Sequence, residues 1–423
     1  MNTSPWRWVP SLYFAQGIPY VVVMTLSVIL YKNLGFSNTD IALYTSWLYL
    51  PWVIKPLWSP LVELFGRKRQ WVAVLQFVLG AALASVALTL PGPQAFKMSL
   101  AVFWLMAFAS ASHDIAADGF YLLALPQKTQ AAFVGVRSTA YRLANIGGQG
   151  GLVWLAGTLA ERTGSVVTAW SWVFGVLGGG FALLALWHLW ALPRPVADVP
   201  GPGRHAAGSL VQDFIGVFAR FFAKPRIAVI LGFLLLYRFP EAQLLKLATP
   251  FLLDPPSEGG LGLTTQQVGI AYGTVGLTAL TLGGLLGGWI ISRVGLKRAL
   301  WPLVAAMHVP NVVFLLLALV HPPGLVVVSS LLALEQFGYG LGFTAYLMAM
   351  IWFAEGQDKT AHYAICTGFM ALGMMLPGMW SGALQDAIGY VPFFAWVLLA
   401  TIPSLVMTAL LRIPEGFGRE EAA

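Results

Sequence analysis

The chain has 423 residues and a composition unlike that of soluble proteins. Hydrophobic residues make up 58% of it and charged residues only 10%, whereas soluble domains carry about 25% charged residues. This balance excludes an ordinary soluble domain and a disordered chain, and it indicates a protein embedded in a membrane. Basic loops on one side of a membrane explain the formal net charge of +7 better than binding to nucleic acid does.

The sequence carries no signal for metal, cofactor or catalysis. Its one cysteine, Cys366, rules out a disulfide within the chain and a cysteine-based metal cluster. A phosphate-binding loop for ATP, a His-Glu-x-x-His motif and a nucleophile elbow are all missing from it. The first residues lack the basic region of a cleavable secretory signal. We therefore expect neither an enzyme nor a bound cofactor.

Twelve segments have the length and apolar character of a helix that crosses a membrane, which needs roughly 20 residues. They cover residues 8–31, 41–62, 70–90, 96–125, 131–160, 166–190, 226–253, 265–292, 299–320, 325–354, 361–387 and 390–411. The predicted fold class is an all-α membrane protein with 12 transmembrane helices.

The only long polar connection lies between the sixth and the seventh segment. It begins with prolines and glycines, and residues 209–222 then place apolar side chains at helical spacing. We predict a cytoplasmic linker at 193–225 with an amphipathic helix on the membrane surface. An early start of the seventh span is the alternative. The linker separates a six-helix bundle at 1–192 from a second one at 226–423.

The basic residues predict the orientation of the chain. If the N-terminus is cytoplasmic, the loops on the opposite side hold only Lys32, Lys97 and Arg162 of the 24 lysines and arginines. Cytoplasmic loops carry an excess of these residues. We therefore expect both termini in the cytoplasm.

A short repeat relates the two halves. The turn after the second span contains Glu63, Gly66 and Arg67, and the turn after the eighth contains Arg293 and Gly295 at matching places. Glycine permits a tight turn between helices, so we assign these residues a gating or structural role. That every cytoplasmic loop is basic explains the charges but not the shared glycine. The repeat resembles the loop motif of the major facilitator superfamily, which implies two pseudo-symmetric six-helix bundles.

Several ionisable residues fall inside the predicted spans: Lys55, Asp114, Asp118, Arg137, Arg142, Arg238, Glu241, Lys246 and Glu335. A charge at the bilayer centre costs at least ~2.5–3.5 kcal/mol, so each needs a partner or a water-filled cavity. They are confined to spans two, four, five, seven and ten. This distribution predicts one central polar cavity.

The fourth span carries two carboxylates on one helix face, Asp114 and Asp118. Their repulsion favours proton uptake by at least one of them. Arg137 and Arg142 of the fifth span lie at matching depths, and Lys55 approaches from the second. The alternative is that these pairs only lock helices together.

For Asp118 we favour proton coupling, with Asp114 and His113 as further proton-handling candidates. A lone histidine at a helix interface is more often a hydrogen-bonded structural residue, and this alternative stays open for His113.

In the second half, Pro240 interrupts the seventh span between Arg238 and Glu241. Broken helices near the middle of a membrane often mark substrate sites. Glu335 of the tenth span is a candidate to neutralise Arg238 or Lys246. The predicted substrate-binding residues are Gln16, Tyr20, Lys55, Arg142, Arg238, Glu241, Lys246 and Glu335.

Motifs in both halves resemble the muropeptide permease family of Gram-negative inner membranes, a family that is also similar to acetyl-CoA transporters. They are KPLWSP at 55–60, SASHDIAAD at 110–118, YRL at 141–143, Tyr237-Arg238 with Glu241, and Glu335 before a glycine run. The resemblance implies proton-driven import of N-acetylglucosaminyl-anhydromuramyl fragments for peptidoglycan recycling. It also implies a location in the bacterial inner membrane.

The chain departs from the pattern of that family at three places. His113 stands where the family usually has glutamine, Gly119-Phe120-Tyr121 lacks a basic residue, and Lys246 is not a family position. These differences leave open an importer of another solute, such as an oligosaccharide, a siderophore or an acyl-CoA-like anion. A membrane sensor that binds without transport is a further alternative. The expected partners are a small-molecule substrate, protons and lipid, and a monomer is expected.

Overall fold

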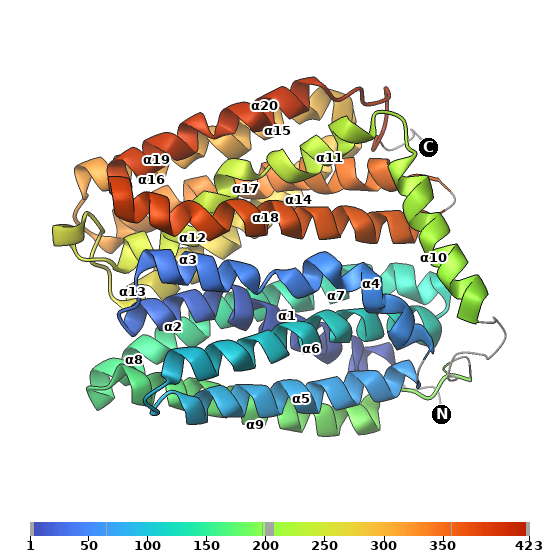
Figure 1. Cartoon of the computed structure of the whole chain (residues 1–423), viewed down its shortest axis with the longest axis horizontal. Coiled ribbons are helices and arrows are strands. Elements are labelled where there is room, and N and C mark those ends of the chain that lie inside the picture. Colours follow the sequence, from blue (N-terminus) through green and yellow to red (C-terminus); the bar gives the residue numbers. More distant parts are fainter. Residues whose placement is uncertain (1–3, 65, 197, 199–206, 357, 420–423) are drawn as a thin grey trace. The chain divides into compact units, whose positions relative to one another are not determined.

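The computed structural model describes residues 4–64, 66–196, 198, 207–356 and 358–419. Within these ranges, the side chains of residues 60, 61, 63, 64, 127, 128, 131, 132, 134, 207–211 and 213 fall outside the description. The described part is helical, as predicted, with turns between the helices and no strand (Figure 1).

The chain divides into two compact units. Unit 1 comprises Met1–Gly35 and Ile54–Ala206, and unit 2 comprises Phe36–Val53 and Ala207–Ala423. The helices of unit 1 are α1 (Val9–Val21), α2 (Ser27–Asn33), α4 (Leu50–Leu64, which begins in unit 2), α5 (Lys68–Thr89), α6 (Ala95–Ala124), α7 (Gln127–Ile146), α8 (Val153–Thr163) and α9 (Val166–Ala191).

Unit 2 contains most of the remaining helices in chain order. They are α3 (Asn38–Trp47), α10 (Ala207–Phe222), α11 (Ile227–Leu236), α12 (Phe239–Leu253), α13 (Thr265–Val268), α14 (Leu277–Val294), α15 (Leu296–His308), α16 (Val312–Val320), α17 (Leu325–Ala354), α18 (Lys359–Ile388), α19 (Tyr390–Leu399) and α20 (Thr401–Ala409).

Ten helical segments are long and apolar enough to cross a membrane, judged by length and composition. They are Pro5–Asn33, Lys68–Thr89, Ala95–Ala124, Val166–Ala191, Ile227–Leu253, Thr265–Val294, Leu296–Val320, Leu325–Ala354, Lys359–Ile388 and Tyr390–Ala409. Ten of the twelve predicted spans are thereby confirmed.

The other two predicted spans are helical but interrupted. The second consists of α3 and α4, separated by a turn at Leu48 and Tyr49. Pro51 follows this turn within the first turn of α4, where a missing N–H does no harm. The fifth consists of α7, a π-helical turn at Gly147–Leu152 and α8. These two spans also carry Lys55, Arg137 and Arg142, because their charged residues serve the site rather than the apolar surface.

α3 follows α2 in the sequence but packs with unit 2, alongside α18 (Figure 1). Asn38 Nδ2 donates a hydrogen bond to Gln385 Oε1 at 2.6 Å. The Thr39 hydroxyl donates to Asp386 Oδ2 at 2.5 Å. A side chain on Gly382 would collide with the backbone of Asn38, so this glycine permits the close approach of the two helices.

The linker helix is confirmed as a separate helix, α10. It ends at Phe222, and Pro225 and Arg226 follow, with Arg226 at φ 59°. The alternative of an early start of the seventh span is therefore wrong. α10 is fixed to unit 2 by Arg220, whose Nε donates to Asp358 Oδ2 at 2.5 Å, and by the buried Phe221 ring.

Glycines place α17 between two neighbouring helices. A side chain on Gly340 would collide with the backbone of α14, and one on Gly338 would collide with the backbone of α15. The predicted role of this glycine run in close packing is confirmed. The run fixes Glu335, one turn earlier on α17, in the interior of unit 2.

Candidate functional site

Asp118 of α6 is the centre of a polar cluster in unit 1. Its Oδ1 accepts one hydrogen bond from the Tyr13 hydroxyl and one from Arg137 Nη2, each at 3.0 Å. The guanidinium also lies 4.4 Å from the centre of the Tyr13 ring. The predicted pairing of Asp118 with Arg137 is confirmed. The side chains of Asp118 and Arg137 remain 42% and 32% exposed, so the pair is accessible.

Asp114 lies one helical turn before Asp118 and pairs with Lys55 of α4. Lys55 Nζ is 3.6 Å from Asp114 Oδ2, and both side chains are partly exposed. Arg142 lies half-buried on α7, and the described residues include no salt bridge between it and an acid. The matching depth of Asp114 and Arg142 therefore does not bring them into a described ion pair.

His113 belongs to a different network from Asp118. It is buried and accepts or donates a 3.0 Å hydrogen bond with Gln76 Nε2. Gln76 Oε1 is 2.7 Å from His188 Nδ1, and His188 Nε2 is 2.9 Å from Ser11 Oγ. This chain joins four helices of unit 1 by hydrogen bonds. The geometry favours the structural alternative for His113, since its described partner is an amide rather than Asp118.

Gln16 and Tyr20 lie on α1 at the face toward α7. Gly17 between them packs against Ala144 and Tyr141, where a methyl group would not fit. Tyr20 interacts electrostatically with Tyr141. Gln16 is buried, and its Oε1 has no hydrogen-bond partner among the described atoms. This oxygen is an available acceptor.

The predicted break in the seventh span is confirmed at Tyr237 and Arg238, between α11 and α12. Pro240 occupies the first turn of α12, a position where proline is tolerated. Arg238 is buried and donates a hydrogen bond to the Tyr339 hydroxyl. Its guanidinium lies 4.8 Å from the centre of the Phe343 ring. Aromatic side chains of α17 therefore hold this cation.

Glu241 is sealed in unit 2 by a second polar chain. Its Oε1 is 2.7 Å from His308 Nδ1 and accepts from Asn311 Nδ2 at 3.2 Å. His308 Nε2 is 2.8 Å from Ser404 Oγ. The Glu241 and His308 side chains are 1% and 3% exposed.

Glu335 does not neutralise either cation by a described salt bridge, so that expectation is wrong for the described residues. Its Oε2 accepts a 2.9 Å hydrogen bond from Gln336 Nε2, the next residue on α17. Gln336 in turn reaches the Tyr272 hydroxyl at 3.3 Å. A buried carboxyl group with an amide partner has no formal positive charge to balance it.

Lys246 of α12 points toward α3 within unit 2. Its Nζ donates to Thr45 Oγ1 at 2.9 Å and lies 5.7 Å from the centre of the Tyr49 ring. The ammonium is thus buried against a hydroxyl and an aromatic face. An anionic ligand would find an uncompensated cation there.

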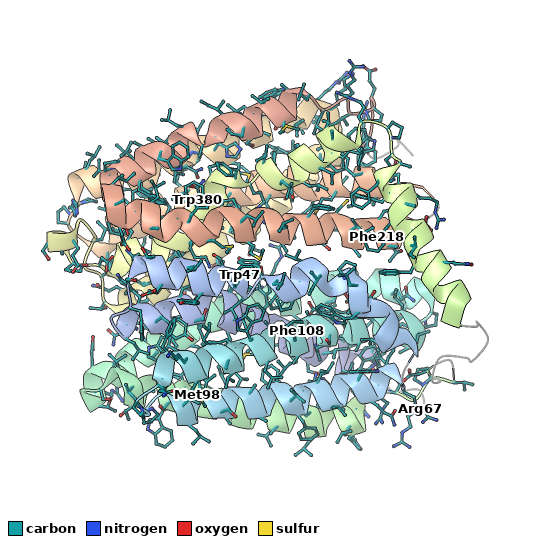
Figure 2. All side chains as sticks on the ribbon, in the orientation of Figure 1. Trp47, Arg67, Met98, Phe108, Phe218 and Trp380 are labelled. Carbon is teal, nitrogen blue, oxygen red and sulfur yellow. The ribbon has the colours of Figure 1, made fainter. Side chains whose placement is uncertain are left out.

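The two turns of the repeat are built alike. Gly66 has φ 72° and Gly295 has φ 81°, both in the region that glycine adopts most readily. Arg293 lies over the Trp289 ring at 5.9 Å. Arg67 is exposed at the turn before α5, as Figure 2 shows. The side chain of Glu63 lies outside the described residues.

Asp198 of the linker closes the turn before α5. Its two carboxylate oxygens accept hydrogen bonds from the backbone N–H groups of Lys68 and Arg69, at 2.7 and 3.1 Å. A carboxylate at a helix N-terminus satisfies N–H groups that have no partner within the helix. The linker is thereby attached to the basic turn.

Sequence reasoning missed most of the neutral members of these networks. It searched the spans for aspartate, glutamate, lysine and arginine. The signal that was available is a polar residue within an otherwise apolar span: Ser11, Tyr13, Gln76, His188, His308, Asn311 and Ser404.

Comparisons with known proteins place this geometry in a known family. Residues 11–364 match the Major Facilitator Superfamily. The chain is 26% identical over 413 residues to the anhydromuropeptide permease of Escherichia coli K12, covering 95% of this chain and 78% of that protein. It is also 26% identical over 407 residues to an uncharacterised protein of Haemophilus influenzae, covering 93% and 91% of the two chains.

Solved structures support the same fold. A mutant of the nucleoside transporter NupG superposes with a TM-score of 0.69 at 17% identity, covering 95% of this chain and 97% of that one. The resemblance to muropeptide permeases that the motifs indicate is confirmed by the permease relative. The protein is a multi-pass membrane transporter, and the chain belongs to the major facilitator superfamily.

Proposed function

We propose that this transporter is a proton-coupled symporter that imports muropeptide-like amino sugars from the periplasm to the cytoplasm. The relative named an anhydromuropeptide permease supports the substrate class. In this proposal the protein works as a monomer in a bacterial inner membrane, with both termini in the cytoplasm. The proposed bundles are 1–192 and 226–423, joined by the linker 193–225.

The observation that carries the proposal is the sharing of one Asp118 oxygen by Tyr13 and Arg137 in an accessible position. A proton on Asp118 removes its charge and leaves Arg137 without its counter-ion. Arg137 then has a free guanidinium to offer to an anion. An accessible ion pair contributes only about 0–1 kcal/mol, so the exchange of partners needs little energy.

The proposed substrate carries carboxylates, amides and hydroxyl groups, and the predicted binding residues offer matching partners. Arg142, Arg238 and Lys246 supply positive charge. Gln16 Oε1 supplies an acceptor for a hydroxyl or amide hydrogen. Tyr20, Lys55, Glu241 and Glu335 complete the proposed set.

The test is uptake of labelled anhydromuropeptide into proteoliposomes with an imposed pH gradient. One pH unit is worth ~1.4 kcal/mol per proton, which supports about tenfold accumulation for one-proton symport. Asp118→Asn keeps the shape and an acceptor oxygen, and we expect it to lose accumulation while keeping exchange at equal pH. Glu161→Gln, at an exposed acid of α8, is the matched control. Normal accumulation by Asp118→Asn would remove the coupling proposal.

The buried Lys246 favours a second candidate, import of another anionic solute. It adds a cation that the muropeptide permease pattern lacks. A thermal-shift screen compares anhydromuropeptide with oligosaccharides, siderophores and acyl-CoA. Stabilisation by one of the other solutes, lost in Lys246→Met, would favour this candidate. Binding without exchange of label across the membrane would instead favour a sensor.

A further inference from the structure

Glu241 is a carboxyl group with an incomplete set of partners in a closed environment. Its Oε1 has two polar neighbours, His308 Nδ1 and Asn311 Nδ2. Its Oε2 is buried and has no hydrogen-bond partner among the described atoms. A buried carboxylate oxygen without a partner is unfavourable, and a proton removes that charge.

The hydrogen bonds around His308 tolerate a change of protonation state. A neutral imidazole donates from Nδ1 to Glu241 and accepts at Nε2 from the Ser404 hydroxyl. A protonated imidazole donates from both nitrogens, and the same hydroxyl then accepts. The 2.7 and 2.8 Å contacts are therefore kept when the Glu241–His308 pair gains a proton.

The surroundings contain both signs of charge. Glu335 of α17 lies near enough for its charge to oppose that of Glu241. Tyr237 of the helix break is influenced by Glu241, by Arg238 and by Tyr346 of α17. Arg238 is three residues before Glu241, and the Tyr339 hydroxyl currently holds it. Lys246 lies further along α12 and is turned to Thr45.

We propose that Glu241 and His308 together bind one proton, and that its release draws Arg238 away from Tyr339. With the proton bound, the pair is neutral overall, as Glu241 carboxylate with imidazolium or as two uncharged groups. Without it, a bare negative charge remains beside Arg238 at the helix break. The attraction of unlike charges is strong in such a buried place. The use of this proton in transport rests on the proposed symport.

A purely structural lock is the competing explanation, because the chain ties α12, α15 and α20 together. Carboxylate, imidazole and hydroxyl also follow the order of a hydrolase triad. Ser404 is completely buried, however, so its hydroxyl is closed to an incoming ester or amide. The experiment must therefore separate a proton site from a lock.

Infrared difference spectra of the full-length protein in lipid, recorded while the pH is stepped from alkaline to acidic, provide that separation. We expect the wild type to gain a carboxylic-acid or imidazolium signal that Glu241→Gln and His308→Gln both lose. Both glutamines keep a hydrogen-bonding side chain, so a lock would survive. Glu161→Gln should match the wild type. Spectra of Glu241→Gln that superpose on those of the wild type would overturn the proposal.

A transport measurement then tests the use of the proton. In proteoliposomes, Glu241→Gln should lose accumulation of labelled anhydromuropeptide driven by a pH gradient and retain exchange at equal pH. Accumulation at the wild-type level would show that this proton is not coupled. If the wild type itself fails to exchange the label, the substrate proposal fails, and the infrared result still decides whether the proton site exists.

Discussion

The acids of unit 1 and those of unit 2 are held in opposite ways. Asp118 and Asp114 are accessible and pair with the cations Arg137 and Lys55. Glu241 and Glu335 are each 1% exposed, and their described partners are histidine and amides. The same transporter thus contains accessible ion pairs and sealed carboxyl groups.

The difference separates two kinds of response. An accessible pair can exchange its partner for water or for an anionic ligand at small energetic cost. A sealed carboxyl group has no such partner available, so its charge changes chiefly through proton uptake. Unit 1 is therefore suited to recognition and unit 2 to proton storage.

The largest expected effect comes from removing His308. His308→Leu leaves Glu241 buried without its imidazole partner, and loss of one member of a buried pair costs about 3–5 kcal/mol. Equilibrium unfolding in detergent with a denaturant series measures it. Arg137→Leu removes the corresponding cation of unit 1 and should cost only about 0–1 kcal/mol. Equal losses in the two variants would contradict the comparison.

A smaller effect is expected at the glycines that position Glu335. Gly340→Ala places a methyl group against the backbone of α14, and such overpacking costs about 1–3 kcal/mol. Gly151→Ala in unit 1 is the matched control, because nothing lies within 4 Å of the added carbon. Thermal unfolding should fall for the first and stay or rise for the second. A loss of similar size in both would show that α17 is not tightly held.

The sequence predicted the helices well because each one follows from its own composition. Apolar length identified the spans, and Pro240 identified the break beside Arg238. The pairing of Asp118 with Arg137 followed from their depth in a hairpin. These features are local, or join neighbouring helices.

The partners of the buried acids escaped because they come from distant helices. Nothing in the spacing of Glu241, His308 and Ser404 shows that α12, α15 and α20 meet. The same holds for Gln76 and His188. Neutral polar residues also occur in spans for other reasons, so their presence alone does not identify a network.

Asp198 tests whether the linker stabilises the basic turn of unit 1. Asp198→Ala removes the acceptor for two backbone N–H groups, a loss of about 0.5–2 kcal/mol at a helix N-terminus. Amide hydrogen exchange at Lys68 and Arg69 should become faster. Asp198→Asn keeps one acceptor oxygen and should show a smaller change. Unchanged exchange in Asp198→Ala would show that the cap does not hold the turn.

The smallest effect concerns an exposed ion pair, this time in unit 2. Two hydrogen bonds from Arg220 keep the pKa of Asp358 below its usual value, with charge from His362 and Lys224 adding to the effect. A lowered pKa stabilises the folded state at pH values above the ordinary value of ~3.9, and the benefit is lost as pH falls through the lowered pKa.

Asp358→Asn should therefore release α10 at neutral pH and should matter progressively less on acidification. Hydrogen–deuterium exchange over residues 214–222 measures this release in the full-length protein. Glu415→Gln breaks a comparable pair with Lys297 elsewhere in unit 2 and serves as the control. If α10 exchanged equally fast in Asp358→Asn and the wild type at neutral pH, packing of Phe221 alone would hold the linker helix. The accessible ion pairs of both units would then share one property, a charge that can be removed with little loss of structure.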